Sequence, residues 1–344
     1  MILEEVAVAV DEAKRFVKAA SRACGILDEE ASIFSDVLVE ADMRGVMTHG
    51  IVRLPEYLDR IVRGGAAKSL CLTVLKEWPW GGALDAGNGI GHVAAYRGMQ
   101  WVINKAKACG IGLATMRMST HFGMAAYYSL MAAKQGMIGI AASNSPPLMA
   151  PWGGKEKKVG NNPFAIAAPG KEFPLSFDIA CTVAARGKLD QARREGKPIP
   201  EGWALNPDGR ETTDPEEAIR GVLLPLAGHK GYGLAVMIDM FTGILSGGKV
   251  SPNIKNKYHF STPRNIGHFF MAVDVEHFQP MEEFLKNADD YVRILHETET
   301  AAGFDKVRVP GEGSEKKKQY SLKHGIRYHR ATIDLLNDMA RRFN

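Results

Sequence analysis

The sequence has few cysteines, and they do not occur in a metal-binding or redox spacing. Four cysteines are present, and no two form a CxxC pair: Cys24, Cys71, Cys109 and Cys181. This distribution argues against a zinc ribbon, a dithiol redox centre and the disulfide framework of a small secreted protein. We therefore expect free, mostly buried thiols in a cytoplasmic protein.

Long apolar runs and a strong charge bias are also absent. The most apolar stretch, residues 232–245, is too short to cross a bilayer and carries Asp239. The first residues are acidic and lack the basic region of a signal peptide, so none is expected. A formal net charge of +4 over 344 residues gives no case for nucleic acid, whose binders show clustered basic patches. We expect neither a membrane nor a nucleic-acid partner, and a small anionic substrate remains compatible.

Several familiar catalytic motifs are incomplete. The segment GNGIGH would need a third glycine at position 92 to complete a dinucleotide-binding fingerprint, and that position is His92. We interpret it as a tight turn that opens a helix. The sequence has no HExxH and no GxSxG, and His49, His121 and His229 have no second ligand at a metal-binding spacing. We therefore expect no metal site, and a serine hydrolase is only weakly supported.

Apolar periodicity predicts helices at both ends of the chain and a mixed α/β middle. In the first helix, we expect Val6, Val10, Ala13 and Val17 to share one face. The other predicted helices cover 29–40, the segment after Leu54, the segment after the GNGIGH turn up to Gly110, 125–135, 215–221, the apolar segment after GHKG, 282–300 and 328–343. The predicted strands cover 70–75, 81–86, 111–116, 137–143, 164–168 and 175–179. We expect a loop over 310–319, and residues 253–308 show no pattern that we can place apart from the helix that begins at 282.

Chemically versatile side chains are concentrated in the stretch DMRGVMTHGIVRLPEY, residues 42–57. If a helix starts or continues there, His49 and Arg53 are four residues apart and lie on one face. A histidine titrates near neutral pH, and an arginine can bind a carboxylate through two hydrogen bonds. The pair suits chemistry on a hydroxy acid or an oxo acid. A surface turn with a solvated histidine and arginine is an equally open interpretation of this stretch alone.

Two other segments carry candidate ligand groups. Ser119, Ser143 and Asn144 follow predicted strands, at the strand ends where α/β proteins tend to bind ligands. In GHKGYGL, His229 and Lys230 precede an apolar helix, whose N-terminus suits a phosphate or carboxylate. A glycine-rich turn with a solvated lysine is the alternative. The residues by themselves indicate an α/β enzyme with an anionic substrate and acid–base chemistry.

Six segments, in this order, resemble the type 2 malate/L-lactate dehydrogenase family. They are DMRGVMTHGIVRLPEY, STHFG, GNNP, FDIA, IPEGWALNPDGRETTDP and GHKGYGL, and VPGE near the C-terminus matches more loosely. The resemblance implies an NAD- or NADP-dependent oxidoreductase without the Rossmann fold, with a largely antiparallel sheet. It also implies a helical domain built from both chain ends (1–75 with 285–344), an α/β cofactor-binding domain (76–284), and a homodimer or larger assembly with the active site near a subunit interface.

The resemblance also assigns roles to residues. His49 and His121 match the two histidines that serve as acid or base in different members, Arg53 matches a substrate-binding arginine, and Thr48 replaces a serine. We expect Arg44 and Asn144 to contact substrate as well. The cofactor-contacting residues are expected to be His121, Ser143, Asp178, Ile179, Ala180, His229, Lys230, Pro310, Gly311 and Glu312. We favour His49 as the proton carrier because Arg53 lies one helical turn away.

The expected reaction is hydride transfer between nicotinamide and a 2-hydroxy acid/2-oxo acid pair, with malate and oxaloacetate as the leading pair. Lactate, sulfolactate or ureidoglycolate oxidation and reduction of a cyclic imino acid or diketo sugar acid are alternatives. Pro146 stands where ureidoglycolate-oxidising members carry an aspartate, which weakens that alternative. A hydrolase that uses a histidine with Asp178, or a non-catalytic binding protein, is a more remote possibility. The lysines at 316–318 are interpreted as a solvated surface, with a 2′-phosphate contact as an alternative.

Overall fold

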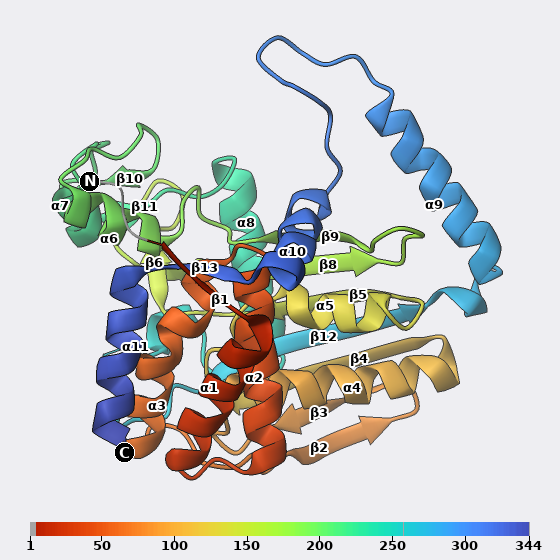
Figure 1. The fold of residues 1–344 in the computed structure, drawn as a ribbon, viewed down its shortest axis with the longest axis horizontal. Coiled ribbons are helices and arrows are strands. Elements are labelled where there is room, and N and C mark those ends of the chain that lie inside the picture. The colour runs from red at the N-terminus through yellow and green to blue at the C-terminus, as the bar shows by residue number, and fades with distance from the viewer. Residues whose placement is uncertain (1–4, 257, 344) are drawn as a thin grey trace.

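A seven-stranded sheet forms the centre of the molecule (Figure 1). The computed structural model describes residues 5–256 and 258–343, so residues 1–4 of the expected helical domain lie outside it. The strand order is β2-β3-β4-β12-β5-β8-β9, and every neighbouring pair is antiparallel except β3 with β4. The strands are β2 (Thr73–Trp78), β3 (Gly81–Asp85), β4 (Ile111–Ser119), β5 (Met137–Ser143), β8 (Phe164–Ala168), β9 (Leu175–Ile179) and β12 (Ile266–Asp274). The expected antiparallel-rich sheet is confirmed.

Side chains of β12 alternate between the two faces of the sheet, because successive residues of a strand point to opposite sides. Phe270 and Ala272 belong to the hydrophobic cluster that includes α4 (Gly91–Cys109) and α5 (Ala126–Ala133). Phe269 and Met271 pack in a second cluster that includes α8 (His229–Asp239). A π-helical turn, Met240–Ile244, follows α8 and also packs on β12. The strand is central, yet it lies in the region where the sequence showed no pattern.

Helices from both chain ends lie side by side next to the sheet (Figure 1). They are α1 (Val10–Ala23), α2 (Asp28–Met43), α3 (Leu54–Val62) and α11 (Arg330–Phe343), and α2 packs against α4. Two short strands, β1 (Glu5–Val8) and β13 (Ile326–His329), pair antiparallel and join the chain ends. The prediction of helix is therefore wrong at Val6 and at residues 328 and 329, whereas the helix predicted up to residue 343 is confirmed from Arg330. Backbone groups of these residues bond across the pair instead.

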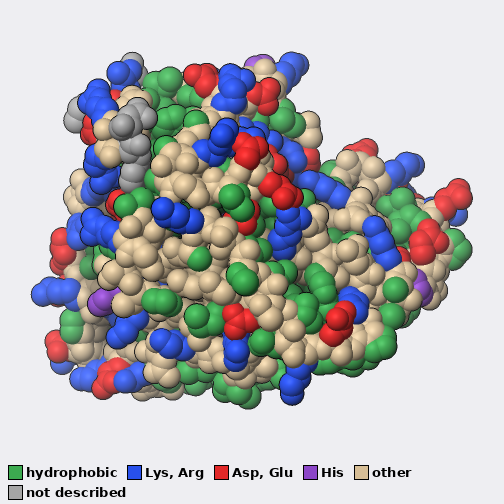
Figure 2. Space-filling view, turned by 90° about the horizontal axis from the view of Figure 1, so that it is seen from below, with side chains coloured by type: hydrophobic (Ala, Val, Ile, Leu, Met, Phe, Trp, Pro, Cys, Tyr) green, Lys and Arg blue, Asp and Glu red, His purple; other side chains and the backbone are tan. Residues whose placement is uncertain are grey.

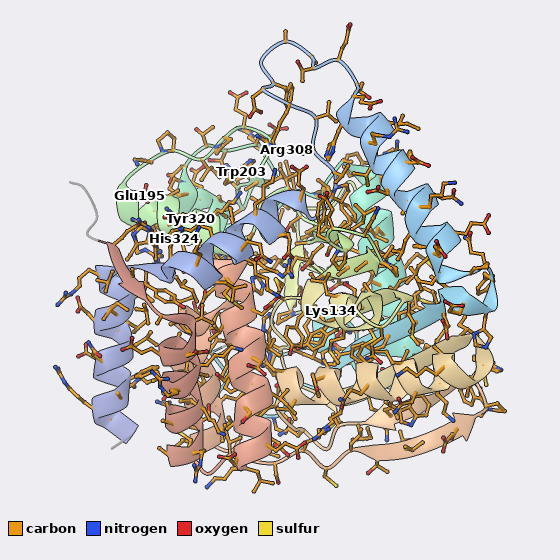
Figure 3. The ribbon with its side chains drawn as sticks, turned by 45° about the vertical axis from the view of Figure 1, so that its right-hand side comes forward. Lys134, Glu195, Trp203, Arg308, Tyr320 and His324 are labelled. Atoms are coloured by element: carbon orange, nitrogen blue, oxygen red, sulfur yellow. The ribbon has the colours of Figure 1, made fainter. Side chains whose placement is uncertain are left out.

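The segment expected to be a loop at 310–319 is mostly helical. Helix α10 (Glu312–His324) begins after Gly311, whose φ of +91° is left-handed. Pairs four residues apart, such as Lys316 with Glu312, support the helix. Tyr320 and His324 lie together on it, with ring centroids 4.5 Å apart (Figure 3). Lys318 is not solvated as expected, because it forms a 2.7 Å ion pair with Glu40 and is only 16% exposed.

Helix α9 (Met281–His296) extends away from the helices of the chain ends (Figure 1). None of its residues is buried. The remaining elements form a small sheet of order β10-β11-β6-β7 with two helices beside it. They are β6 (Pro147–Met149), β7 (Val159–Gly160), β10 (Ala204–Leu205), β11 (Val222–Leu223), α6 (Arg186–Glu195) and α7 (Pro215–Arg220). The predicted helix after Asp214 is confirmed, and Asp214 caps it.

The surface charge and the lengths of the helices are relevant to the expected partners. On the face shown in Figure 2, acidic and basic side chains are interspersed. Within the described ranges, no helix is both long and apolar enough to cross a membrane.

All four cysteines are free, but only Cys24 and Cys181 are buried, whereas Cys71 and Cys109 are exposed. The expectation of mostly buried thiols is therefore only half right.

Candidate active site

One cavity of about 1270 Å³ contains most of the residues singled out in the sequence. It is bounded by the turn after α2, the ends of β4, β5 and β9, and the segment that leads into α10. The residues predicted for catalysis, Thr48, His49, Arg53 and His121, all line it. So do Arg44, Ser143, Asn144, Asp178, Ile179, Ala180, Pro310 and Gly311. These residues come from distant parts of the chain, and the fold brings them to one place.

The turn that carries His49 is held by a buried carboxylate. Two short 3₁₀ turns, Met47–His49 and Ile51–Arg53, meet at Gly50. The Ile51 N–H donates to Asp42 Oδ2 at 2.9 Å. A Cβ atom on Gly50 would lie 1.7 Å from Asp42 Oδ1, so only glycine allows this close packing. Burial raises the pKa of Asp42 to about 7.

The two candidate histidines face each other in the cavity. Their ring centroids are 5.6 Å apart in a stacked arrangement. His49 Nδ1 lies 3.0 Å from the hydroxyl of Thr48. His121 Nδ1 lies 2.8 Å from the hydroxyl of Tyr57 and accepts a 3.2 Å hydrogen bond from the Gly123 N–H. Burial, with a further contribution from Arg53, lowers the pKa of His49 to about 4 and that of His121 well below its usual value.

Two arginines give the cavity a positive charge beside these rings. Arg53 pairs with Glu56 at 2.9 Å and lies over the Tyr57 ring. The second is Arg264, which was not predicted from the sequence; it lines the same cavity and is 3% exposed. Its Nε donates to the Lys255 carbonyl at 3.1 Å. Burial lowers the pKa of Arg264 to about 10. Its place just before β12, at a strand end, was the available signal, but β12 itself was not predicted.

Arg44 and Asn144 line the cavity wall but already have protein partners. Arg44 is buried and forms ion pairs with Glu40 at 2.8 Å and Glu315 at 3.0 Å. The Asn144 amide donates to Asp239 at 3.0 Å and to the Lys249 carbonyl, and its oxygen accepts from the Gly267 N–H. These contacts give both side chains a structural role. Their contact with substrate remains a prediction.

Residues expected to bind the cofactor fall into two groups, those that line the cavity and those that lie outside it. Asp178 accepts a hydrogen bond of 2.9 Å from the Ala126 N–H at the start of α5, and burial raises its pKa to about 6. The 310–311 backbone packs against β9, where Ser176 N–H donates to the Pro310 carbonyl at 3.2 Å. Among the ten residues expected to contact the cofactor, His229, Lys230 and Glu312 are not lining residues of the cavity.

These three residues have other surroundings. His229 and Lys230 are exposed at the start of α8, and the His229 ring lies 6.0 Å from that of Trp152. Glu312 is buried and paired with Lys316, Lys306 and His296. The Lys316 ammonium, with these other donors, lowers the pKa of Glu312 to about 2. A cofactor role for the three residues stays a prediction.

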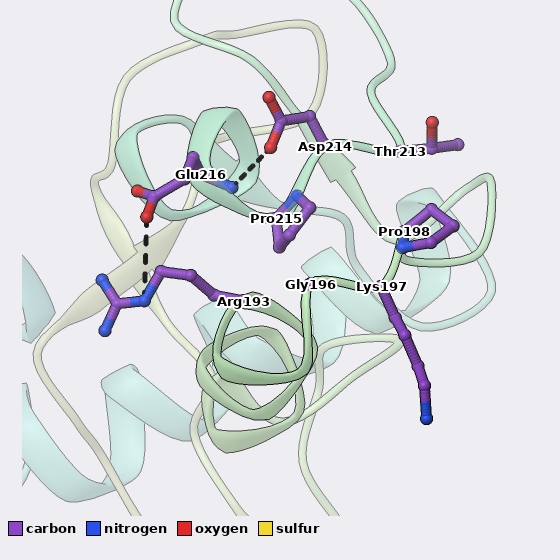
Figure 4. Close-up of a pocket in the computed structure, with 8 residues that line it drawn as sticks. All are labelled: Arg193, Gly196, Lys197, Pro198, Thr213, Asp214, Pro215 and Glu216. Carbon is purple, nitrogen blue, oxygen red and sulfur yellow. Dashed lines mark hydrogen bonds and ion pairs between the residues drawn. The ribbon is translucent and has the colours of Figure 1, made fainter.

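A second, more open pocket of about 490 Å³ lies between α6 and the start of α7 (Figure 4). Its charged side chains have partners within the chain. Arg193 pairs with Glu216, Lys197 pairs with Glu195, and Asp214 caps the backbone N–H of residue 216. The first cavity is therefore the better candidate for chemistry. Among the described residues, no group of three or more His, Cys, Asp or Glu side chains is placed to hold a metal ion.

Comparisons with known proteins found related sequences and related structures. A family sequence model described as malate/L-lactate dehydrogenase matches residues 8–337. A malate dehydrogenase of Pyrococcus horikoshii is 44% identical over 326 residues, which are 92% of this chain and 90% of that protein. An L-sulfolactate dehydrogenase of Methanocaldococcus jannaschii is 40% identical over 294 residues, 86% of this chain and 85% of that protein. The crystal structure of malate dehydrogenase from Entamoeba histolytica has a TM-score of 0.95 at 34% identity and covers 99% of both chains.

Proposed function

Because the chain belongs to the malate/L-lactate dehydrogenase family, we propose that its cavity interconverts malate and oxaloacetate. The enzyme is a 2-hydroxy acid dehydrogenase that uses NAD or NADP. The single observation that carries the choice of a dicarboxylate is the excess of positive charge beside the two histidines. Arg53 and Arg264 line the cavity there, with Glu56 as the carboxylate paired to Arg53.

The dimensions and lining of the cavity fit a dinucleotide together with a small acid. Pockets for drug-sized ligands are typically about 300–1,000 Å³, and this one is about 1270 Å³. We propose that Asp178 to Ala180, Ser143, Pro310 and Gly311 hold the cofactor, because they line the same cavity as the two histidines and the two arginines. When bound, the nicotinamide ring supplies the hydride chemistry.

The protein residues bind the substrate and handle its proton. Arg53 and Arg264 would each bind one of the two carboxylates of malate, and charge-assisted hydrogen bonds of this kind are stronger than neutral ones. A histidine takes the proton of the hydroxyl during oxidation and returns it during reduction. Lactate has one carboxylate and would leave one of the two arginines without a substrate contact. Sulfolactate, with a sulfonate and a carboxylate, satisfies the same two cations and is the second candidate.

We further propose a cytoplasmic homodimer. Support for the dimer comes from exposed apolar side chains that follow one face of α8 and the π-helical turn. These are Leu234, Met237, Met240, Phe241, Ile244 and Leu245. The amphipathic α9 also exposes Tyr291 and Ile294. Light scattering should give twice the chain mass, with dissociation for Ile244→Glu and no change for the exposed control Lys171→Glu. A monomeric wild type would contradict the dimer.

The substrate is tested by following reduced-cofactor absorbance, with NADH and NADPH separately, against oxaloacetate, pyruvate, sulfopyruvate and a cyclic imino acid. We expect oxaloacetate to give the highest kcat/KM. His49→Ala and His121→Ala, assayed for cofactor binding and turnover, separate loss of chemistry from loss of the cofactor site. Preference for pyruvate or the imino acid would overturn the proposed substrate. Failure to bind either cofactor would overturn the proposed cofactor cavity.

A further inference from the structure

The contacts of His121 fix which of its ring nitrogens carries the proton. The backbone N–H of Gly123 points at Nδ1 from 3.2 Å, and a backbone N–H can only donate. Nδ1 must therefore present its lone pair. In the neutral ring the hydrogen is then on Nε2, which has no hydrogen-bond partner among the residues that the structure describes. His121 itself lines the cavity.

Tyr57 reinforces this arrangement. Its hydroxyl lies 2.8 Å from the same Nδ1 atom, and burial raises the pKa of Tyr57 to about 12, so the hydroxyl keeps its proton. The ring is held by edge-on contacts with His92 at 4.7 Å and Phe34 at 5.7 Å between centroids. Tyr57 is therefore a second donor to Nδ1 in a fixed position.

His49 is not restricted in this way. The partner of its Nδ1 is the hydroxyl of Thr48, at 3.0 Å. A hydroxyl can donate or accept, and its hydrogen rotates to suit. When Nδ1–H donates to Thr48, Nε2 of His49 carries a lone pair. His49 can therefore accept a proton at Nε2, whereas His121 already carries one there.

We propose that the two histidines have different and fixed tasks, with Tyr57 and the Gly123 N–H as the positioning groups. His49 accepts the proton, and His121 donates a hydrogen bond through Nε2–H to the substrate oxygen. This division rests on the proposed function. In oxidation the substrate O–H bond breaks and its proton moves to His49 Nε2. The hydride leaves the same carbon for the oxidised cofactor, a C=O bond forms, and His121 keeps its proton.

The charges around His121 favour this assignment. Arg53, Arg264 and the rings of His49 and His92 all oppose a positive charge on it, in addition to burial. For His49, burial and Arg53 are the causes of its lowered pKa. Protonation of His121 at Nδ1 would also set its new N–H against that of Gly123. Proton uptake is thus opposed by more groups at His121 than at His49.

The tautomer is measurable without turnover. In the full-length protein with 15N-labelled histidine, the two ring nitrogens of His121 are assigned by the loss of signals in His121→Gln. We expect a protonated Nε2 and an unprotonated Nδ1 in the neutral ring, in wild type and also in Tyr57→Phe, since the Gly123 N–H remains. A protonated Nδ1 in wild type would overturn the inference, whatever the enzyme's substrate proves to be.

Paired substitutions then test the tasks. Glutamine keeps an N–H donor but has no basic nitrogen, so it can replace a donor and cannot replace a base. We expect His121→Gln to recover at least about 10-fold in kcat over His121→Ala, and His49→Gln to remain as low as His49→Ala, roughly 100-fold or more below wild type. The reverse pattern would overturn the division of tasks. Absence of wild-type turnover with every 2-hydroxy acid would refute the proposed function and leave the tautomer to the NMR result.

Discussion

The Tyr328 hydroxyl donates a 2.8 Å hydrogen bond to Oδ2 of Asp42, although the two residues are 286 positions apart. Tyr328 lies on β13 near the C-terminus, and Asp42 lies near the end of α2. The same Asp42 oxygen accepts the Ile51 N–H, so one buried carboxylate joins the chain end to the turn that carries His49. Its other oxygen has no partner within the described part of the chain.

This carboxylate should make stability depend on pH. The folded pKa of Asp42 is about 7, above the usual value of 3.8, because burial opposes its charge. Between these values the folded chain binds more protons than the unfolded chain, so stability falls as pH rises. The Asp42 contribution is up to roughly 4 kcal/mol, complete by about pH 7. We expect Asp42→Asn to weaken the fall, measured by urea unfolding at pH 5 and pH 8.

The control for this experiment is Asp290→Asn, which changes an exposed carboxylate on α9 that is 50% accessible. It should reproduce the wild-type pH dependence. If Asp42→Asn and wild type lose the same free energy of unfolding between the two pH values, Asp42 is not the titrating group.

Loss of the Tyr328 hydroxyl should be costly in a different way. Tyr328→Phe keeps the aromatic ring, which is buried because Tyr328 is only 1% exposed. The change leaves Asp42 with one hydrogen-bond donor fewer. Oδ2 keeps the Ile51 N–H as its remaining donor. The loss of one hydrogen bond to a buried carboxyl group costs about 1–3 kcal/mol, and we expect a decrease in the free energy of unfolding in that range at pH 7. The double variant with Asp42→Asn should show a non-additive effect. Additive losses would mean that the two side chains act independently.

Strand β12, which was not predicted from the sequence, gives a third prediction. Phe270 lies on β12, is fully buried, and contacts the cluster that includes α4 and α5. Truncation of a buried phenylalanine costs about 3–5 kcal/mol, so Phe270→Ala should lower the free energy of unfolding by that amount. Phe278→Ala, at a side chain that is 74% exposed, is the matched control and should change it by about 0.5 kcal/mol or less. Similar effects of the two changes would contradict the central place of β12.

The sequence predicted some elements well because their signals are local. Strands β8 and β9 have the predicted bounds, since β8 (FAIAA) is a short apolar run, β9 (LSFDI) alternates apolar and polar residues, and both are bounded by turn residues. In β12 both faces are covered, so IGHFFMAVD lacks the alternation that marks a half-buried strand. In α10 no apolar stripe is present, and ion pairs together with a hydrogen bond from Ser321 to the Met43 carbonyl hold it.

In the candidate site, too, some features were predictable from the sequence and others were not. The family expected from the six segments is confirmed, and with it His49, Arg53 and His121 are found in one cavity. The contact between Tyr57 and His121 spans 64 residues, and no spacing in the sequence indicates it. Arg264 was missed because its strand was missed. Long-range contacts of this kind are set by the tertiary fold.

Arg264 should discriminate between substrates. If it binds the second carboxylate, Arg264→Gln should lower kcat/KM for oxaloacetate by about 10- to 100-fold, the value of a charged hydrogen bond of about 1.5–3 kcal/mol. The effect on pyruvate should be much smaller, because pyruvate has one carboxylate. Arg293→Gln, at an arginine on α9 that is 58% exposed, is the control. Equal losses of kcat/KM for oxaloacetate and pyruvate would mean that Arg264 does not bind the second carboxylate.

The pH dependence of malate oxidation should reveal the surroundings of His49. A base must be unprotonated, so activity is lost as pH falls through its pKa, and burial together with Arg53 lowers that of His49 to about 4. The acid limb of kcat/KM, which reports the free enzyme, should therefore lie near pH 4 and not near 6.5. The limb of kcat should lie higher, because bound malate neutralises Arg53. As a control for denaturation, samples exposed to low pH should recover full activity when returned to pH 7. An acid limb of kcat/KM at pH 6.5 would show that His49 is not the base or is more solvated than its packing indicates.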